Sequence, residues 1–220
     1  MSGILGCIVI IVLVYLYNQG SNNQTRKILN PLRRLQLQQE LHKAKIGVRY
    51  IGKAHQYLIL GNILLELGDL DRAQLSYTKA LNKDPKNSYA LWGAALVASD
   101  QDRWAVASRH LELLLKIDPK HLQGDASLLY AKALFNLGKW SIARTQLNED
   151  IYYWGHPEAT VMLAKIEIQD GNIGTAKKML ENMIFKLKGA PSYHSRRYQL
   201  LIREAEGILR TTSLARFQII

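Results

Sequence analysis

Two stretches of the chain repeat the same residue pattern at a shift of 34 residues, and this repeat constrains the fold more than any other feature. Counted from Ala54, the pattern consists of Tyr57, Leu60, Gly61, Leu64, Gly68, Ala73, Tyr77, Ala80 and Pro85. Counted from Ser88, the same intervals give Leu91, Ala94, Ala95, Ala98, Asp102, Ala107, Leu111, Leu114 and Pro119. Self-similarity at such a period is typical of stacked supersecondary units.

The pattern resembles the tetratricopeptide (TPR) family, whose signature is W-x2-L-G-x2-Y, A-x3-F and P at a period of about 34 residues. In that family each unit is a pair of antiparallel helices, and small residues lie where the two helices approach most closely. Tyr77 then fills the space toward the next unit. Gly68 permits a left-handed turn that ends the first helix, and Asp69 can cap the second. Asp84-Pro85 stops the second helix, because the residue before a proline disfavours helical geometry.

The pattern continues more weakly toward the C-terminus. Residues 127–147 keep the internal spacings after a small insertion around Gln123-Gly124, and a fourth unit follows from Pro157. Pro191 opens a terminal helix from Ser192 to about Leu209. The repeat therefore predicts an all-α fold, a right-handed solenoid of three to four TPR units with a capping helix. The expected boundaries are 54–87, 88–121, about 124–156 and about 157–190 for the repeats, and 191–220 for the capping helix and tail.

Residues 1–20 predict a transmembrane anchor ahead of the solenoid. Gly3 to Tyr17 contains no charged residue, and the extended segment reaches the lower limit of about 17 residues for crossing the hydrocarbon core. A cleaved signal peptide is the alternative. It is disfavoured because no Lys or Arg precedes the apolar core and Tyr17 to Gly20 offers no small-x-small cleavage site.

Residues 21–53 predict a basic juxtamembrane segment with a lead-in helix, since Ile28 to Gln56 shows helical apolar spacing. Against the single acid Glu40, this segment carries Arg26, Lys27, Arg33, Arg34, Lys43, Lys45, Arg49 and Lys53. Short flanks rich in Lys and Arg stay on the cytoplasmic side. We therefore expect a single-pass membrane protein whose N-terminus is outside. Its repeats then lie on the cytoplasmic side of a bacterial inner membrane, or on the stromal side of a thylakoid.

The net charge of +11 leaves nucleic-acid binding open as an alternative of a different class. A nucleic-acid-binding motif is absent from the sequence. The basic residues concentrate beside the predicted anchor, where attraction to anionic lipid contributes about 1 kcal/mol for each of them. The six histidines and the single Cys7 show no H-E-x-x-H or C-x-x-C spacing, and no Gly-rich phosphate loop or G-x-S-x-G is present. We predict that this protein is not an enzyme and that it has no cofactor and no metal site.

The resemblance also implies where a partner binds. In TPR proteins the side chains two, five, nine and twelve places into a unit face a concave groove. On this chain the predicted groove-facing residues are His55, Leu58, Asn62, Leu65, Tyr89, Trp92, Leu96, Ser99, Asp125, Leu128, Lys132, Phe135, Glu158, Val161, Lys165 and Ile168. The binding residues we select from them are Leu58, Asn62, Leu65, Tyr89, Trp92, Leu96, Leu128, Lys132 and Phe135. Leu58 and Trp92 are the expected anchors, because large apolar and aromatic side chains dominate binding hot spots.

Two alternatives concern this groove. Residues of the fourth unit can instead pack against the terminal helix. The two-carboxylate clamp of chaperone-binding TPR modules is not matched, since of its positions only Asn62 agrees. A groove with an apolar and aromatic share suits an amphipathic helix or an extended segment of a partner. The prediction is a membrane-anchored scaffold or adaptor for the assembly or regulation of a membrane protein complex, or a permanent structural subunit of such a complex.

Overall fold

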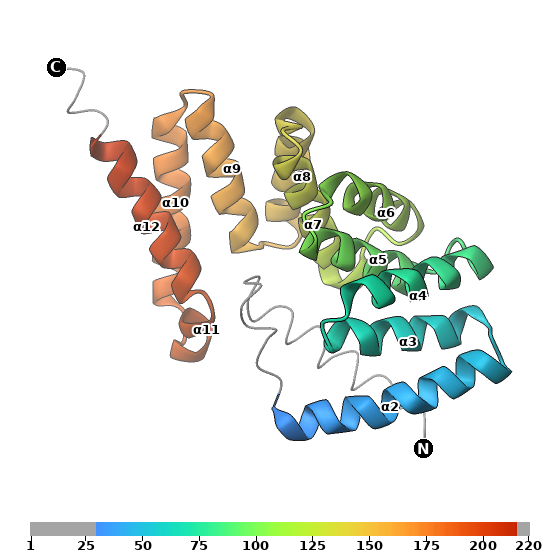
Figure 1. Ribbon diagram of the computed structural model, residues 1–220. Helices are drawn as coiled ribbons and strands as arrows, with labels where there is room; N and C mark the ends of the chain where they lie inside the picture. The colour runs from blue at the N-terminus through green and yellow to red at the C-terminus, as the bar shows by residue number, and fades with distance from the viewer. Residues whose placement is uncertain (1–29, 215–220) are drawn as a thin grey trace. The chain divides into compact units, whose positions relative to one another are not determined.

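The computed structural model describes residues 30–214, and within that range every regular element is a helix (Figure 1). The expected all-α, TPR-like solenoid is confirmed. The chain divides into two compact units, residues 1–117 and 118–220. Among residues 30–214 no helix is long and apolar enough to cross a membrane. The anchor predicted at 1–20 lies outside the described residues.

Unit 1 contains five described helices, in which each helix packs against the next along the chain. They are α2 (Pro31–Tyr50), α3 (Ala54–Glu66), α4 (Leu70–Lys83), α5 (Ser88–Asp100) and α6 (Trp104–Ile117). Helix α3 also lies beside α5. The pairs α3–α4 and α5–α6 fall within the two segments that carry the 34-residue pattern, and α2 covers the open side of α3 (Figure 1).

Unit 2 begins with a short 3-10 turn and continues as helical pairs. Its elements are η2 (His121–Gly124), α7 (Asp125–Asn136), α8 (Trp140–Tyr153), α9 (Pro157–Gln169), α10 (Ile173–Gly189), α11 (Ser192–Arg197) and α12 (Gln199–Leu214). Helix α7 lies beside α9, and α12 packs against both α9 and α10. A buried cluster that includes Val161, Leu180 and Ile202 joins these last three helices.

The local turn signals act as expected. Gly68 adopts a left-handed φ of +80° between α3 and α4. The side chain of Asp69 accepts a hydrogen bond from the backbone N–H of Arg72 at 3.3 Å, which caps α4. Helix α4 ends at Lys83, directly before Asp84-Pro85. These residues fix helix ends through short-range geometry, so their effect is visible in the sequence.

Tyr77 fills the space between successive helical pairs of unit 1. Its side chain is fully buried, and its hydroxyl donates a 2.8 Å hydrogen bond to Oδ1 of Asn62. A Cβ added at Gly61 would lie 2.7 Å from the ring, and one added at Gly93 would lie 2.3 Å from it. The ring is therefore held between α3 and α5 at two glycines. The sequence pattern identified Gly61 and Tyr77 but not Gly93.

The insertion around Gln123-Gly124 forms the start of unit 2. Leu122 and Gln123 have φ of +50° and +55°, and Gly124 has φ of +94°. The indole ring of Trp154 covers Gly124, since a Cβ there would lie 2.4 Å from the ring. The end of α8 is thus packed against the beginning of α7, and glycine is required at the contact for both space and backbone conformation.

Two expected helices differ in extent from their prediction. Within the described residues the lead-in helix covers Pro31–Tyr50 and ends before the expected Gln56, because the chain turns at Gly52, whose φ is +61°. The single terminal helix expected from Ser192 is wrong. The chain forms α11 and α12 instead, separated at Tyr198, whose φ and ψ of −103° and 13° leave the α-helical region.

Candidate protein-binding surface

Four of the predicted groove residues in unit 1 lie in the core, and Ser99, at 8% exposure, is one of them. Leu58 and Trp92 are 8% exposed and Leu96 is 6% exposed. Leu58 belongs to the cluster formed with Leu64 and Tyr77. Leu58 and Trp92 therefore present little surface on the first helices, because helix packing takes up most of their area, and their role as binding anchors stays a prediction. A binding anchor has to present its side chain to the partner.

The remaining groove residues of unit 1 keep more surface. Tyr89, in the first turn of α5, is 50% exposed. Asn62 and Leu65 are partly buried, and Asn62 is the acceptor for the Tyr77 hydroxyl. His55 is exposed at the beginning of α3. Helix α3 lies beside α5, so the first helices of unit 1 carry an exposed Tyr89 and an exposed His55.

In unit 2 the predicted residues of α7 lie at the edge of a core cluster. Leu128 and Phe135 are partly buried and pack against the cluster that includes Leu134, Leu147 and Leu163. Lys132 is also partly buried. Each side chain thus retains some surface on a rigid helix. This combination of a fixed backbone and a partly open apolar ring suits contact with a partner.

The fourth predicted set packs largely against α12, as the alternative interpretation foresaw. Val161 is 2% exposed in the cluster that contains Ile202 of α12. The Nζ of Lys165 lies 2.7 Å from the carboxylate of Glu204 on α12. Ile168 is partly buried against the same cluster. These residues stabilise the attachment of the terminal helix, which leaves less of their surface for a partner.

An ionisable group at the α8–α9 turn connects elements of unit 2. His156 Nδ1 lies 2.8 Å from the carboxylate of Asp150, which is fully buried, and its Nε2 lies 3.8 Å from Asp125. Burial lowers the pKa of His156, but the hydrogen bond to Asp150 and the negative charges of Asp150, Asp125 and Glu158 outweigh it, so the pKa is raised. The group ties the end of α8 to the beginnings of α7 and α9 and has a structural role there.

Burial also raises the pKa of Tyr198, and the charges of Glu158 and Asp125 raise it further, against an opposing effect of Arg197. Tyr198 therefore shares the negative environment of the α7 and α9 N-termini.

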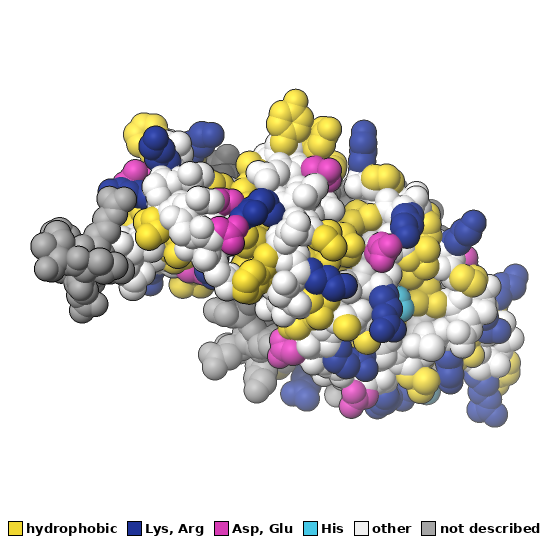
Figure 2. Space-filling view, turned by 90° about the horizontal axis from the view of Figure 1, so that it is seen from above, with side chains coloured by type: hydrophobic (Ala, Val, Ile, Leu, Met, Phe, Trp, Pro, Cys, Tyr) yellow, Lys and Arg dark blue, Asp and Glu magenta, His cyan; other side chains and the backbone are white. Residues whose placement is uncertain are grey.

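In residues 30–214 no group of three His, Cys, Asp or Glu side chains is placed to hold a metal ion. Basic and acidic side chains both appear on the face seen in Figure 2, where the basic ones stand in separate groups.

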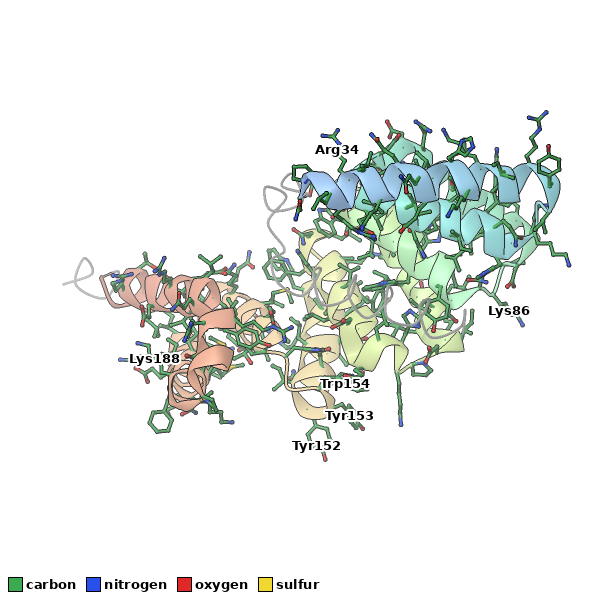
Figure 3. All side chains as sticks on the ribbon, turned by 90° about the horizontal axis from the view of Figure 1, so that it is seen from below. Arg34, Lys86, Tyr152, Tyr153, Trp154 and Lys188 are labelled. Atoms are coloured by element: carbon green, nitrogen blue, oxygen red, sulfur yellow. The ribbon has the colours of Figure 1, made fainter. Side chains whose placement is uncertain are left out.

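The sequence reasoning missed a pair of exposed aromatic residues at the end of α8. Tyr152 and Tyr153 are 82% and 71% exposed, and their rings meet edge to face with centroids 4.9 Å apart. They project from the helix end, while the neighbouring Trp154 covers Gly124 (Figure 3). The Tyr-Tyr-Trp run before Gly155 was the available signal, but the repeat pattern gives these positions no role.

A family profile described as tetratricopeptide repeat matches residues 54–87. Among curated proteins, no match was found. Among solved structures, the fold is similar to MamA, residues 41 to the end, from Desulfovibrio magneticus RS-1. That match has a TM-score of 0.67 and 18% identity over 73% of this chain and 91% of the other.

Two further solved structures share the fold. YrrB, described as a TPR protein with an unusual peptide-binding site, gives a TM-score of 0.58 and 21% identity over 73% of this chain and 84% of the other. A tetratricopeptide repeat protein from Parabacteroides merdae ATCC 43184 gives 0.56 and 18% identity over 80% and 73%. At these identities the likeness establishes the fold alone. Together with the profile match, it identifies the repeat that the sequence pattern predicted.

Proposed function

We propose, from the premise that this chain is a tetratricopeptide-repeat protein, that it is a non-enzymatic scaffold that binds a protein partner on its first helices. The fold is consistent with such a role. The observation that carries the proposal is the presence of partly open aromatic side chains, Tyr89 on α5 and Phe135 on α7, at positions that TPR proteins turn toward their partners. The partner segment is a helix or an extended strand of chain, which such faces accommodate.

The proposal includes attachment to a membrane. Its support is the charge-free stretch within residues 1–20 and the excess of Lys and Arg in residues 21–53. By the positive-inside rule the repeats are cytoplasmic or stromal. A scaffold held at this place can gather a subunit of a membrane protein complex for assembly or regulation. Resistance of the full chain to carbonate extraction tests the attachment independently of partner binding.

Site-specific photocrosslinking tests which face binds. A photoreactive amino acid is placed at Tyr89 in one variant of the full chain and at Leu75 in its matched control. Tyr89 on α5 and Leu75 on α4 are 50% and 54% exposed, so both probes are equally accessible in unit 1. In unit 2, Phe135 on α7 is compared with Ile142, which is 54% exposed on α8.

The expected result, in native membranes, is a crosslinked partner band from Tyr89 and Phe135 and a much weaker one from the two controls. Mass spectrometry then identifies the partner. A band that survives high-salt washing and detergent purification in fixed stoichiometry indicates a permanent subunit. Stronger crosslinking from Leu75 and Ile142 than from Tyr89 and Phe135 would show that the second helices bind, and the assignment of the surface would fail.

A further inference from the structure

Helix α2 has two apolar faces, and only one of them is used within unit 1. On the inner face Leu37 is fully buried, Ala44 is 9% exposed, and Leu41 packs beside them against α3. On the outer face the large apolar side chains are exposed: Leu32 by 70%, Leu35 by 55%, Ile46 by 44% and Tyr50 by 77%. The outer face is unusual because a solenoid normally ends in a polar surface, which keeps it soluble.

The exposed apolar side chains lie on one side of the helix. Successive residues of an α-helix are rotated by about 100°, so the spacings of 3, 11 and 4 residues from Leu32 through Leu35 and Ile46 to Tyr50 keep all four within a sector of about 60°. Between Leu35 and Ile46 the same side of the helix carries the exposed polar residues Gln39 and His42, so the stripe consists of one apolar pair toward each end of a helix that, at 20 residues, is about 30 Å long. We call it the outer stripe of α2.

Basic residues border the outer stripe. Lys43 lies about 20° beyond one edge of the stripe and Arg49 about 40° beyond the other, while Lys45 and Arg34 lie about 80° and 100° beyond the second edge, and all four are exposed. Arg34 points away from the body of unit 1 (Figure 3). The guanidinium of Arg49 lies 5.9 Å from the centre of the Tyr50 ring. Lys43 and Arg49 thus flank the outer stripe, and Lys45 and Arg34 add positive charge to the side of α2 beyond Arg49.

The acidic groups near α2 are paired with Arg33. Glu40, the acid of this helix, accepts a hydrogen bond from Arg33 at 3.4 Å. Arg33 also donates to both carboxylate oxygens of Glu66 on α3, at 2.7 and 2.9 Å. Through these contacts Arg33 holds α2 on α3 and pairs with both acids. The outward surface keeps an uncompensated positive charge.

We propose that the outer stripe of α2 lies in the headgroup region of an anionic lipid bilayer, with the helix axis parallel to the membrane plane. An apolar stripe with Lys and Arg at its edges is the pattern of helices that bind at a membrane interface. The inference rests on the membrane attachment proposed above. Residues 21–30 can span at most about 35 Å, so α2 begins close to the point where the predicted anchor leaves the membrane.

Charge argues against a second copy of this chain as the occupant. A two-fold contact brings the same patch of both subunits together, and here it would bring the basic borders of the two stripes into proximity. Like charges at a contact cost binding energy. An anionic bilayer instead gains from each of the basic residues that border the stripe, since they attract its headgroups.

A fluorescence measurement on the full chain in vesicles tests the proposal. Cys7 is replaced by Ser, and an environment-sensitive dye is attached through Leu35→Cys. The matched control carries the dye through Leu75→Cys on α4, where the exposure is 54% against 55% at Leu35. In vesicles of phosphatidylcholine and phosphatidylglycerol, lipids with a nitroxide near the headgroup should quench the dye at Leu35. They should leave the dye at Leu75 bright, and an aqueous quencher should show the reverse order.

Charge variants separate the lipid interaction from general effects of net charge. In the first, the four exposed cations of α2 are changed to Gln: Arg34, Lys43, Lys45 and Arg49. In the second, four exposed cations elsewhere are changed to Gln: Lys86, Arg109, Lys120 and Lys139. The first set should remove most of the lipid quenching at Leu35, as should vesicles of phosphatidylcholine alone. The second set should leave it within error of the original chain.

Four outcomes overturn the proposal. A dye at Leu35 that stays open to the aqueous quencher in a carbonate-resistant chain shows that α2 stands off the membrane, while the anchor itself is sound. Shielding of Leu35 without lipid quenching, together with crosslinks between copies, shows that a second copy covers the stripe. Equal loss of lipid quenching in both charge variants shows that the border residues have no specific role. Loss of the chain to carbonate extraction removes the membrane attachment on which the proposal rests.

Discussion

Replacement of Gly93 by Ala tests how successive helical pairs fit together in unit 1. The new Cβ would lie 2.3 Å from Cζ and 2.4 Å from Cε1 of Tyr77, far inside van der Waals contact. The ring cannot move away easily. It is fully buried, its hydroxyl is held by Asn62 at 2.8 Å, and Gly61 lies against it as well.

Two opposing terms set the size of the effect. Alanine is favoured over glycine in a helix interior by about 0.8–1.0 kcal/mol. Overpacking of a well-filled core costs about 1–3 kcal/mol, and a contact as short as this one belongs at the upper end of that range. We expect Gly93→Ala to lower the free energy of unfolding by about 1–2 kcal/mol. For a chain of this length that corresponds to a fall in Tm of about 2–8 °C.

The assay is thermal and urea unfolding of the full chain in detergent, followed by far-ultraviolet circular dichroism. Gly207→Ala in α12 is the matched control, because a Cβ there meets no atom within 4 Å. That variant should be neutral or stabilised by up to about 1 kcal/mol. A double-mutant cycle with Tyr77→Leu should show coupling of about 1 kcal/mol or more, since the smaller side chain relieves the clash.

An unchanged or higher Tm for Gly93→Ala would refute the reasoning, as would additivity of Gly93→Ala and Tyr77→Leu. Either result would mean that the two helices separate at low cost. The contact between Tyr77 and α5 would then not determine how the second repeat packs against the first.

Three further predictions concern other contacts. Gly124→Ala combines a strained φ of +94° with a contact of 2.4 Å to an indole ring, so it should cost roughly 2–4 kcal/mol of stability. Gly171→Ala has a φ of +82° but open space, and urea titration should show it losing clearly less. Because the pKa of His156 is raised above its ordinary 6.5 beside Asp150, its protonated form stabilises the fold fully below pH 6.5, and this contribution is lost as the pH rises through the higher folded-state pKa. The Tm difference between the original chain and His156→Asn should therefore shrink as pH rises through that range, and a constant difference would contradict the linkage. Trp92→Ala, at a residue 8% exposed, should cost about 3–5 kcal/mol of stability, so a Tm close to that of the original chain would restore Trp92 as a candidate surface anchor.

The predicted features that the structure confirms depend on short-range geometry. Gly68 and Asp69 set a turn and a cap through their own backbone and side-chain properties, and Pro85 stops a helix through its immediate neighbour. The position of Tyr77 followed from its place in the repeat. The prediction of a single terminal helix was wrong because the separation of α11 from α12 at Tyr198 has no strong local signal such as a proline or glycine.

By itself, the sequence determined that this chain is a stack of helical pairs, because a 34-residue repeat of small and apolar residues can bury its faces only by stacking. Which side chains are available to a partner was decided by the tertiary structure. Trp92 and Tyr89 are both aromatic residues at predicted groove positions, yet one is 8% and the other 50% exposed. Exposure depends on how much of each side chain the neighbouring helices cover. A repeat pattern gives equivalent positions the same role and does not show which of them another helix covers. The exposure of the outer stripe of α2 was likewise decided by the tertiary structure. Helix α2 has apolar side chains on two faces, and packing against α3 determines which face is buried.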